Sequence, residues 1–383
     1  MKKFLLLFTI TFLLLGCRKD DSIPITPPPP GPEVTKTGDF AVFSMPLKNE
    51  KINFNTVAFG RESKLNLKDY PKVSLTDNGY GHPSIIYAPD GFAGYKYWCA
   101  LTPYFSVIFQ QADYMAYENP HIFMSNDGVN WEEPSSKTNP LDVAWPGPII
   151  SYWSDPNLLL NDGKLYLYYR GNAFPSAYYG DRVYHHRAVV ARETSDGINW
   201  SNRKLLYSTT TSKGLDRESM IVSPAFVKDN DKFVCYDVVY STTTNPINSA
   251  GNQTTGFVMR RTDSSPTGNF GDYSENNICK FSNRPWGIEN DPWHIDVCKY
   301  DSNFFMLICA GLVGKSNGDA IYLAYSKDGI NFKVIEKPLF ASDTYKSALV
   351  PISSDKDQVK FKLYRSVKTK GTIELYDLTL NKL

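Results

Sequence analysis

The sequence predicts an all-β protein, specifically a five-bladed β-propeller, and three observations lead to this prediction. Short runs rich in Tyr, Val, Ile and Phe alternate with clusters of Gly, Asn, Asp and Pro, and long helical periodicity is nearly absent. One turn motif recurs at a spacing of 66 to 69 residues. An opening hairpin recurs five times, and repeated four-stranded units of such length are typical of propeller blades.

The N-terminus predicts a targeting segment that is separate from the fold. The basic segment Met1-Lys2-Lys3 precedes an apolar run, residues 4–15, which is too short to cross a hydrocarbon core of about 30 Å. The run ends at Gly16-Cys17, which resembles a bacterial lipobox, and the following Asp20-Asp21 resembles the export tag of surface lipoproteins in the Bacteroidetes. We therefore predict a lipoprotein signal peptide over 1–17, acylation of Cys17, and a lipid-anchored place at the outer membrane or cell surface, facing the periplasm if the protein is not exported.

A proline-rich stretch follows, with Pro27 to Pro30 and Pro32 inside the segment 18–38. Such runs favour an extended polyproline II conformation of about 3.1 Å per residue. We expect this segment to be a stiff linker that holds a propeller domain, residues 39–383, away from the membrane.

The recurring turn reads SNDGVNW at 125–131, TSDGINW at 194–200 and SKDGINF at 326–332. The first two Asp-Gly pairs are 69 residues apart and the last two are 132 apart, twice 66, with a degenerate copy at 262–270 between them. Asp-Gly supplies the positive φ of a tight turn, and Asp and Ser side chains bond nearby backbone N–H groups. These turns resemble the Asp-boxes of propeller glycosidases, and we interpret them as structural.

The opening hairpins start near His82, Asp155, Ser223, His294 and Ser347. Residues 40–383 divide into five units of about 69 residues, which agrees with the period of the turns. The last unit is short of sequence, so we expect a strand around Phe40–Ser44 to complete its sheet and close the ring.

In a propeller the first strand of each blade lines the central axis, so residues at the strand starts share one funnel. The chain has five His, four of which fall on this predicted face, together with acidic and basic residues. Such a set indicates either a ligand site or a structural polar plug. The strand starts are His82, Asp155, Ser223, His294 with the adjacent Trp293, and Lys346; deeper lie Ser84, Asn157 and Asp296; second strands end at Tyr104, Arg170, Asp237 and Arg365; third strands bring Glu118, His185, His186 and Arg187; and a loop adds Asp216, Arg217 and Glu218.

The amino-acid composition limits the classes of molecule that the protein is expected to bind. With 41 basic and 40 acidic residues the net charge is +1, so nothing indicates nucleic acid or an anionic surface. Aromatic residues make up 14% of the chain, which suits stacking on sugars as well as ordinary β-sheet packing. Five Cys remain after Cys17, mostly in apolar strand patterns, and we expect them to be buried thiols.

The hairpins resemble those of the five-bladed glycoside hydrolases, the group of families 43, 62, 32, 117 and 130. The stretch SDPNLLLNDGKLYLYYR is similar to the second-blade hairpin of family 43, whose Asp orients the acid and tunes its pKa, and this maps to Asp155. GHPSIIYAPDG and ESMIVSPAF stand where that family carries its general base and general acid. The resemblance implies a cell-surface glycoside hydrolase that acts on a plant, algal or host polysaccharide or its oligosaccharides, without a required cofactor.

Two departures from family 43 change the assignment of roles. The base position is His82 rather than Asp, and the acid position is Ser223, with Glu218 five residues earlier. A glycosidase needs one protonated carboxyl and a second group that activates water or attacks the sugar. The candidates are Glu118 and Glu218 as acid or base, Asp155 as their modulator, and His82, His294 or Asp296 as base.

The other funnel residues are predicted to bind substrate: Tyr104, Arg170, His185, His186, Arg187, Ser223, Asp237, Trp293 and Arg365. Arg170 and Arg187 could hold a substrate carboxylate or pair with a neighbouring Asp or Glu, and both readings stay open. The resemblance also allows a structural calcium on the axis near His294 and Asp296. We expect a monomer. Two alternatives to hydrolysis stay open, a glycan-binding propeller without turnover and a polysaccharide lyase.

Overall fold

The structure is a computed structural model, and it describes residues 38–55, 72–109, 112–114, 118–135, 138–142, 152–174, 185–210, 219–240, 256–271, 273–312 and 318–383. Strands dominate these residues and form five separate sheets. A single 3-10 turn, Glu275–Asn277, is the one helical element among them. The predicted all-β five-bladed propeller is confirmed.

Each sheet is one blade. Its first strand lies at the axis, and the following strands lie successively further out. Blade 1 contains β4 (Lys72–Phe92), β5 (Tyr95–Phe109), β7 (His121–Ser125), β8 (Asn130–Glu132) and β3 (Asn53–Asn55), with β6 (Ala112–Tyr114) beside β5. Blade 2 contains β9 (Tyr152–Asn161), β10 (Lys164–Phe174), β11 (His185–Thr194) and β12 (Lys204–Ser208). Blade 3 contains β13 (Met220–Asp229), β14 (Lys232–Tyr240) and β15 (Gly256–Asp263). Blade 4 contains β17 (Asn290–Tyr300), β18 (Asn303–Leu312), β19 (Gly318–Ser326), β20 (Asn331–Val334) and β16 (Lys280–Phe281). Blade 5 contains β21 (Ala348–Ser354), β22 (Gln358–Val367), β23 (Thr372–Lys382) and β1 (Phe40–Ser44), with β2 (Leu47–Asn49) also paired to β23.

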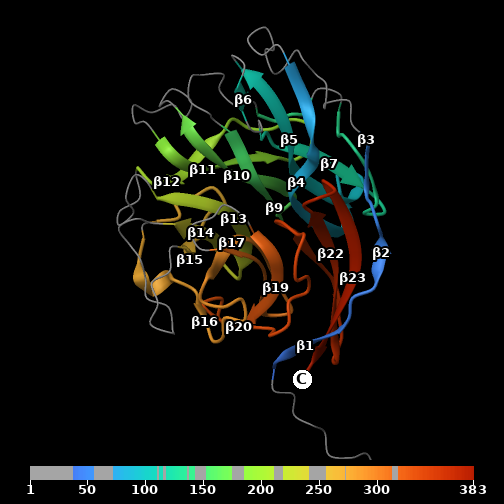
Figure 1. Cartoon of the computed structure of the whole chain (residues 1–383), viewed down its shortest axis with the longest axis vertical. Coiled ribbons are helices and arrows are strands. Elements are labelled where there is room, and N and C mark those ends of the chain that lie inside the picture. The colour runs from blue at the N-terminus through green and yellow to red at the C-terminus, as the bar shows by residue number, and fades with distance from the viewer. Residues whose placement is uncertain are drawn as a thin grey trace, which may run out of the picture. The chain divides into compact units, whose positions relative to one another are not determined.

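The first strands of the five blades form a closed ring around the axis. Strand β4 contacts β9, β9 contacts β13, β13 contacts β17, β17 contacts β21, and β21 returns to β4. Figure 1 shows β9, β13 and β17 near the centre of this ring. This arrangement brings residues that are far apart in the sequence to one hub.

The ring is closed by the N-terminal strand, as predicted. Strand β1 pairs with β23 in antiparallel register, with Phe40 opposite Lys382. Backbone hydrogen bonds join Gly38 N to Leu383 O at 3.2 Å and Leu383 N to Asp39 O at 2.9 Å. Both ends of the described domain therefore belong to blade 5.

The hydrophobic core is distributed between neighbouring blades rather than gathered in one place. One cluster joins blades 3 and 4, for example Val238 with Met306, and another joins blades 2 and 3 through Tyr168 and Phe226. Those two rings stack with centroids 3.6 Å apart. The five described cysteines are free thiols, and four of them are buried as predicted, whereas Cys298 is half-buried.

The recurring turns fold identically in the three blades that carry the full motif. In the first, Asp127 Oδ1 accepts hydrogen bonds from Val129 N at 2.7 Å and Asn130 N at 2.8 Å, and Oδ2 accepts one from Asn130 Nδ2. Asp196 and Asp328 receive the same set. Burial opposes ionisation of Asp127, but these donors outweigh it and lower its pKa to about 2. The structural reading of these turns is supported.

Each turn also docks on the preceding blade. Tyr364 of blade 5 donates to Gly128 O of the blade 1 turn at 3.1 Å, and Tyr236 of blade 3 donates to Gly329 O of the blade 4 turn at 2.9 Å. At the degenerate copy Tyr168 donates to Pro266 O at 2.9 Å. The turns therefore fasten successive blades at the outer rim.

Residues 1–37 lie outside the described residues, so the signal peptide, the lipobox Cys17 and the linker stay predictions. Among the residues that the structure describes, no helix has the length and apolar character needed to cross a membrane.

Candidate functional site

A repeated backbone kink directs side chains toward the axis. His82, Asp155 and Ser223 have φ values of 53°, 53° and 50°, and each stands directly before a proline on its inner strand. The strand pairing shifts register at the same place in each blade. A left-handed non-glycine residue costs about 1–3 kcal/mol, and such residues cluster at functional sites. The kink thus marks one shared position in three blades.

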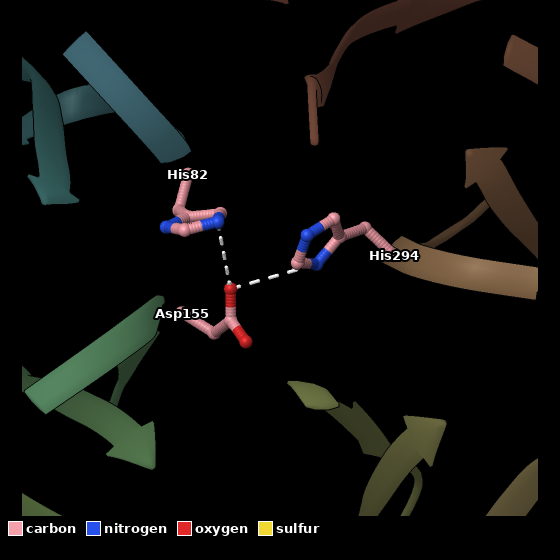
Figure 2. Close-up of side chains that lie close together, drawn as sticks. All are labelled: His82, Asp155 and His294. Carbon is pink, nitrogen blue, oxygen red and sulfur yellow. Dashed lines mark ion pairs between the residues drawn. The ribbon is translucent and has the colours of Figure 1, made fainter. Parts of the chain in front are cut away.

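Three side chains from three different blades converge at this level. His82 Nε2 lies 3.3 Å from Asp155 Oδ1, and His294 Nδ1 lies 3.5 Å from the same oxygen. Figure 2 shows the two imidazoles and the carboxylate pointing at one another from separate strands. All three are buried, with at most 1% of their surface exposed. We call His82, Asp155 and His294 the axial triad.

Asp155 is held from its other oxygen. Arg170 Nε donates to Oδ2, and the backbone N of Ser223 donates to the same atom at 3.1 Å. Burial alone would raise the pKa of Asp155, but Arg170 and then the two histidines hold it well below its usual range. Asp155 is therefore ionised, and Arg170 forms the ion pair that was one of its two predicted roles.

The histidines are neutral and oriented by hydroxyl groups. Thr102 Oγ1 lies 2.7 Å from His82 Nδ1, and Ser223 Oγ lies 2.6 Å from His294 Nδ1. Burial lowers the pKa of His82 to about 3 and that of His294 well below its ordinary value, against the attraction of Asp155. Neutral imidazoles have a lone pair available to bind a metal ion.

The axial triad is a set of side chains that could hold a metal ion. Its ligand atoms lie within 4.8 Å of one another. Among the described residues, Asp155 Oδ1 and His294 Nε2 are buried without a hydrogen-bond partner. Because His82 Nδ1 lies beside the Thr102 hydroxyl, Nε2 is the His82 nitrogen that faces the Asp155 carboxylate, at 3.3 Å from Oδ1. Tetrahedral zinc ligands at about 2.1 Å from the ion lie about 3.4 Å apart, which agrees with the 3.3 Å between His82 Nε2 and Asp155 Oδ1.

Glu118 is the titratable group beside the triad. Its Oε2 lies 3.7 Å from His82 Nδ1, and its side chain is 15% exposed. Burial raises the pKa of Glu118 to about 7; Arg170 opposes the shift and the negative charge of Asp155 adds to it. A carboxyl with such a pKa can both accept and donate a proton near neutral pH.

Blade 5 contributes two more residues to the site. Lys346 is buried and donates to the carbonyl of Pro156 at 2.9 Å, directly after Asp155. The Tyr345 ring packs against His294 with centroids 4.5 Å apart and against His82 at 5.3 Å. Trp293 Nε1 donates to the Tyr345 hydroxyl at 3.2 Å.

The residues deeper in the funnel form a separate group further along the inner strands. Ser84, Asn157 and Asp296 help to line a cavity of about 260 Å³. Their side chains accept backbone hydrogen bonds from the next blade: Ser84 from Leu158 at 3.0 Å, Asn157 from Phe226 at 2.8 Å, and Asp296 from Leu349 at 2.9 Å. Asp296 does not join the axial triad, so His294 meets Asp155 rather than the predicted partner Asp296.

Two predicted substrate contacts are occupied elsewhere. Asp237 is fully buried, accepts from Tyr207 at 3.0 Å and pairs with Arg261 at 3.3 Å, so its carboxylate has no exposed surface to offer a sugar. Arg365 pairs with Glu374 at 3.0 Å and donates to the carbonyls of residues 342 and 343. A sequence pattern places a residue at a strand end, but it cannot show which partner the side chain meets.

Several predicted site residues lie in parts of the chain that the structure does not describe. Glu218, with Asp216 and Arg217, lies outside the described residues, and so do the side chains of Tyr104, His185 and His186. Arg187 is half-buried on β11. Sequence reasoning missed Thr102 and Tyr345. An aromatic residue before the blade start was a usable signal for Tyr345, because Tyr345-Lys346 stands in blade 5 as Trp293-His294 does in blade 4.

Comparison with known proteins confirms the fold. No family model matches the chain. A curated A type blood N-acetyl-α-D-galactosamine deacetylase of Flavonifractor plautii is 25% identical over 307 residues, covering 71% of this chain and 36% of the relative, so the chain spans about a third of that protein's length. A crystal structure of an N-acetylgalactosamine deacetylase from F. plautii, in complex with blood group B trisaccharide, superposes with a TM-score of 0.61 at 18% identity, covering 88% of this chain and 96% of that one.

A family 117 glycoside hydrolase of Zobellia galactanivorans has a TM-score of 0.48 at 14% identity, covering 88% of this chain and 89% of that one. An α-L-arabinofuranosidase of Fusarium graminearum and an α-L-arabinanase of Penicillium chrysogenum are also among the structural neighbours, each with a TM-score of 0.47. The similar proteins are carbohydrate-active enzymes, and the similarity to the deacetylase structure supports the fold.

Proposed function

We propose that the protein is a hydrolase that acts on a glycan and removes the acetyl group from a 2-acetamido sugar with the help of a divalent metal ion. The observation that carries this proposal is the axial triad, in which two neutral imidazoles approach one ionised carboxylate at 3.3 and 3.5 Å. Within it, Asp155 Oδ1 and His294 Nε2 are buried without a hydrogen-bond partner among the described residues. O-glycoside hydrolysis requires two carboxyl groups that can act on the substrate. In this site Asp155 is held by Arg170 and the Ser223 backbone, which leaves Glu118.

His82, Asp155 and His294 are the residues that would hold the ion. Nitrogen ligands with one carboxylate suit zinc and similar transition metals better than calcium, which prefers oxygen. A cation bound there would polarise an acyl oxygen and lower the pKa of a water molecule. Thr102 would fix His82 through Nδ1 and leave Nε2 for the ion, as outer partners of metal ligands do. Ser223 bonds His294 at Nδ1, which leaves His294 Nε2 as the nitrogen without a hydrogen bond.

Glu118 supplies the proton transfers. As a carboxylate it takes a proton from water while the water oxygen bonds to the acyl carbon. The carbon–nitrogen bond then breaks, and Glu118 returns the proton to the departing nitrogen, so that acetate and a free amine leave. A pKa of about 7 suits both halves of this exchange. Asp155 takes no part in these proton transfers, because Arg170 and the Ser223 backbone N–H both bond to its Oδ2.

The Flavonifractor relative supports the choice of bond, because that protein is named as a deacetylase of an N-acetylated sugar. The axial triad does not depend on that likeness, since it follows from the side chains of this chain alone.

O-glycoside hydrolysis is the second candidate. The observation that favours it is the separation of two carboxyl pKa values in one site, with Glu118 near 7 and Asp155 well below its usual range. Such a split assigns an acid and an ionised partner in glycosidases.

The test uses the full chain loaded with Zn²⁺ and a panel of glycans with terminal acetamido sugars. We expect release of acetate, loss of this activity after EDTA, and its return with Zn²⁺. Asp155→Asn should weaken Zn²⁺ binding, measured by calorimetry, by at least about 100-fold. Loss of an outer-shell partner costs up to about 100-fold, and loss of a direct ligand should cost at least as much.

Other outcomes of this assay would contradict the deacetylase proposal. Reducing sugar without acetate, unaffected by EDTA, would favour the glycosidase. Unsaturated products that absorb in the ultraviolet would favour a lyase. Glycan binding without any product would favour a binding protein.

We also propose that the enzyme is lipid-anchored at the cell surface, on the strength of the Gly16-Cys17 lipobox. Labelled palmitate should enter the wild type and not Cys17→Ser, and surface proteolysis of whole cells should remove the protein. Labelling of Cys17→Ser at the wild-type level would contradict this.

A further inference from the structure

Tyr345 covers the axial triad from blade 5. Its ring meets the His294 ring almost edge-on, at 75° with centroids 4.5 Å apart, and lies 5.3 Å from the His82 ring. The residue is half-buried, so part of it is accessible. Tyr345 therefore stands beside the place where the acyl group of the proposed substrate would react.

The Tyr345 hydroxyl has an unusual hydrogen-bond role. Indole nitrogen can only donate, so the 3.2 Å contact from Trp293 Nε1 makes the Tyr345 oxygen an acceptor. The hydroxyl hydrogen is therefore available to donate, and among the described residues it has no acceptor. Trp293 is itself held by ring contacts with Tyr240 and His294.

Other tyrosines of the fold behave in the opposite way. The hydroxyls of Tyr168, Tyr236, Tyr240 and Tyr364 each donate to a backbone carbonyl, at distances of 2.6 to 3.1 Å. In those residues the hydrogen is used to fasten the structure. The Tyr345 hydrogen is not used in this way, which separates Tyr345 from the structural tyrosines.

The hydroxyl stays protonated under working conditions. Burial raises the pKa of Tyr345 far above neutral, and the negative charges of Glu118 and Asp155 raise it further against the opposing effect of the Trp293 bond. A neutral phenol close to two carboxylates is a hydrogen-bond donor at any physiological pH.

We propose that Tyr345 donates a hydrogen bond to the acyl oxygen of the substrate as negative charge develops on it, and that Trp293 is the positioning residue that turns the Tyr345 hydrogen toward the funnel. This inference rests on the proposed function. A preset donor aimed at a developing oxyanion contributes about 10²–10³-fold to kcat, because its full strength is reached only in the transition state.

The kinetic test compares Tyr345→Phe with Tyr236→Phe, a matched loss of a tyrosine hydroxyl at an outer turn. We expect Tyr345→Phe to lower kcat by about 10²–10³-fold with KM and Zn²⁺ affinity nearly unchanged. Tyr236→Phe should leave kcat unchanged. A kcat for Tyr345→Phe within threefold of the wild type would overturn the inference.

Trp293→Phe tests the positioning role. It should lower kcat by a smaller factor, and it should cost nothing further when combined with Tyr345→Phe, since Trp293 acts through the hydroxyl that is already missing. Multiplying losses in the double variant would contradict this assignment.

A binding measurement separates this inference from the proposed function. Acetate, titrated into the Zn²⁺-loaded protein in a calorimeter, should bind Tyr345→Phe at least tenfold more weakly than the wild type. Equal acetate affinities would overturn the inference whatever the wild type hydrolyses. Failure of the wild type to release acetate from any sugar, with the acetate difference intact, would overturn only the deacetylase proposal.

Discussion

The outer rim and the axis of this propeller use repetition in opposite ways. At the rim, Asp127, Asp196 and Asp328 occupy turns of nearly the same sequence, and each carboxylate receives the same set of local hydrogen bonds. At the axis, His82, Asp155 and Ser223 share one backbone kink but carry different side chains. Repeated side chains therefore mark the scaffold, and a repeated backbone with divergent side chains marks the site.

The hydrogen bonding of two aspartates shows what the difference means. Both oxygens of Asp127 are satisfied within its own turn. Asp155 is satisfied at Oδ2, while Oδ1 is buried among two imidazoles without a hydrogen bond. The hydrogen-bonding capacity of the rim carboxylate is used within its own turn, whereas the axial carboxylate keeps one oxygen for the proposed metal ion.

The largest expected effect comes from the axis. Glu118→Gln should lower the rate of acetate release by about 10²–10⁴-fold, because the variant cannot accept a proton. Zn²⁺ affinity should stay close to the wild type, measured by calorimetry. Retention of more than a tenth of the activity would remove Glu118 from its proposed role.

The pH dependence sharpens the same point. A general base must be ionised, so kcat/KM should rise with pH and level off above an apparent pKa of about 7. Folding raises the pKa of Glu118 from its ordinary 4.5 to about 7. The contribution of Glu118 to the free energy of unfolding therefore falls as pH rises from 4.5 to about 7. Urea unfolding at pH 8 should therefore find Glu118→Gln at least as stable as the wild type, and a less stable variant would indicate a scaffold role.

The largest effect at the rim should follow Gly197→Ala. A Cβ there would lie 2.1 Å from the Trp98 ring, at a φ of +74°. Overpacking and backbone strain together should cost about 2–6 kcal/mol in urea unfolding. The matched control is Gly163→Ala, which has a φ of +71° and open space around it, so that only strain of about 1–3 kcal/mol applies. Equal losses in the two variants would show that the contact with the neighbouring blade is unimportant.

A smaller effect is expected at the outer partner of the triad. Thr102→Val keeps the shape of the side chain and removes the hydroxyl that orients His82. Zn²⁺ affinity should fall by about 10–100-fold, as measured by calorimetry. Unchanged affinity would mean that His82 is oriented without Thr102.

The smallest effect should come from Tyr364→Phe, which removes one hydrogen bond between a rim turn and its neighbour. The free energy of unfolding should fall by about 1 kcal/mol, with no change in Zn²⁺ affinity or acetate release. A loss of Zn²⁺ affinity here would show that rim and axis are coupled after all.

The sequence predicted the fold because the features that build it are local and repeated. Asp-Gly turns, alternating strands and the spacing of the hairpins all lie within short windows, and the role of Phe40–Ser44 followed from the count of strands. The convergence of His82, Asp155 and His294 was also predictable, because it depends only on equivalent positions around a ring.

The partners of the site residues were not predictable in the same way. Asp237 and Asp155 both belong to the predicted funnel, yet one is neutralised by Arg261 deep in blade 3 and the other faces two histidines. Such choices depend on side chains from strands tens of residues apart. The link from Thr102 to His82 has no sequence pattern at all, because a threonine in a strand is ordinary.

The pairing of β1 with β23 has a consequence for biosynthesis. Strand β1 is made before any of the inner strands and has to wait for β23, so the ring of blades cannot close until translation has passed Lys382. Until then blades 1 and 5 lack their final neighbour, and a nascent chain that already carries His82, Asp155 and His294 is expected to bind metal poorly. The proposed activity would thus arrive only with closure.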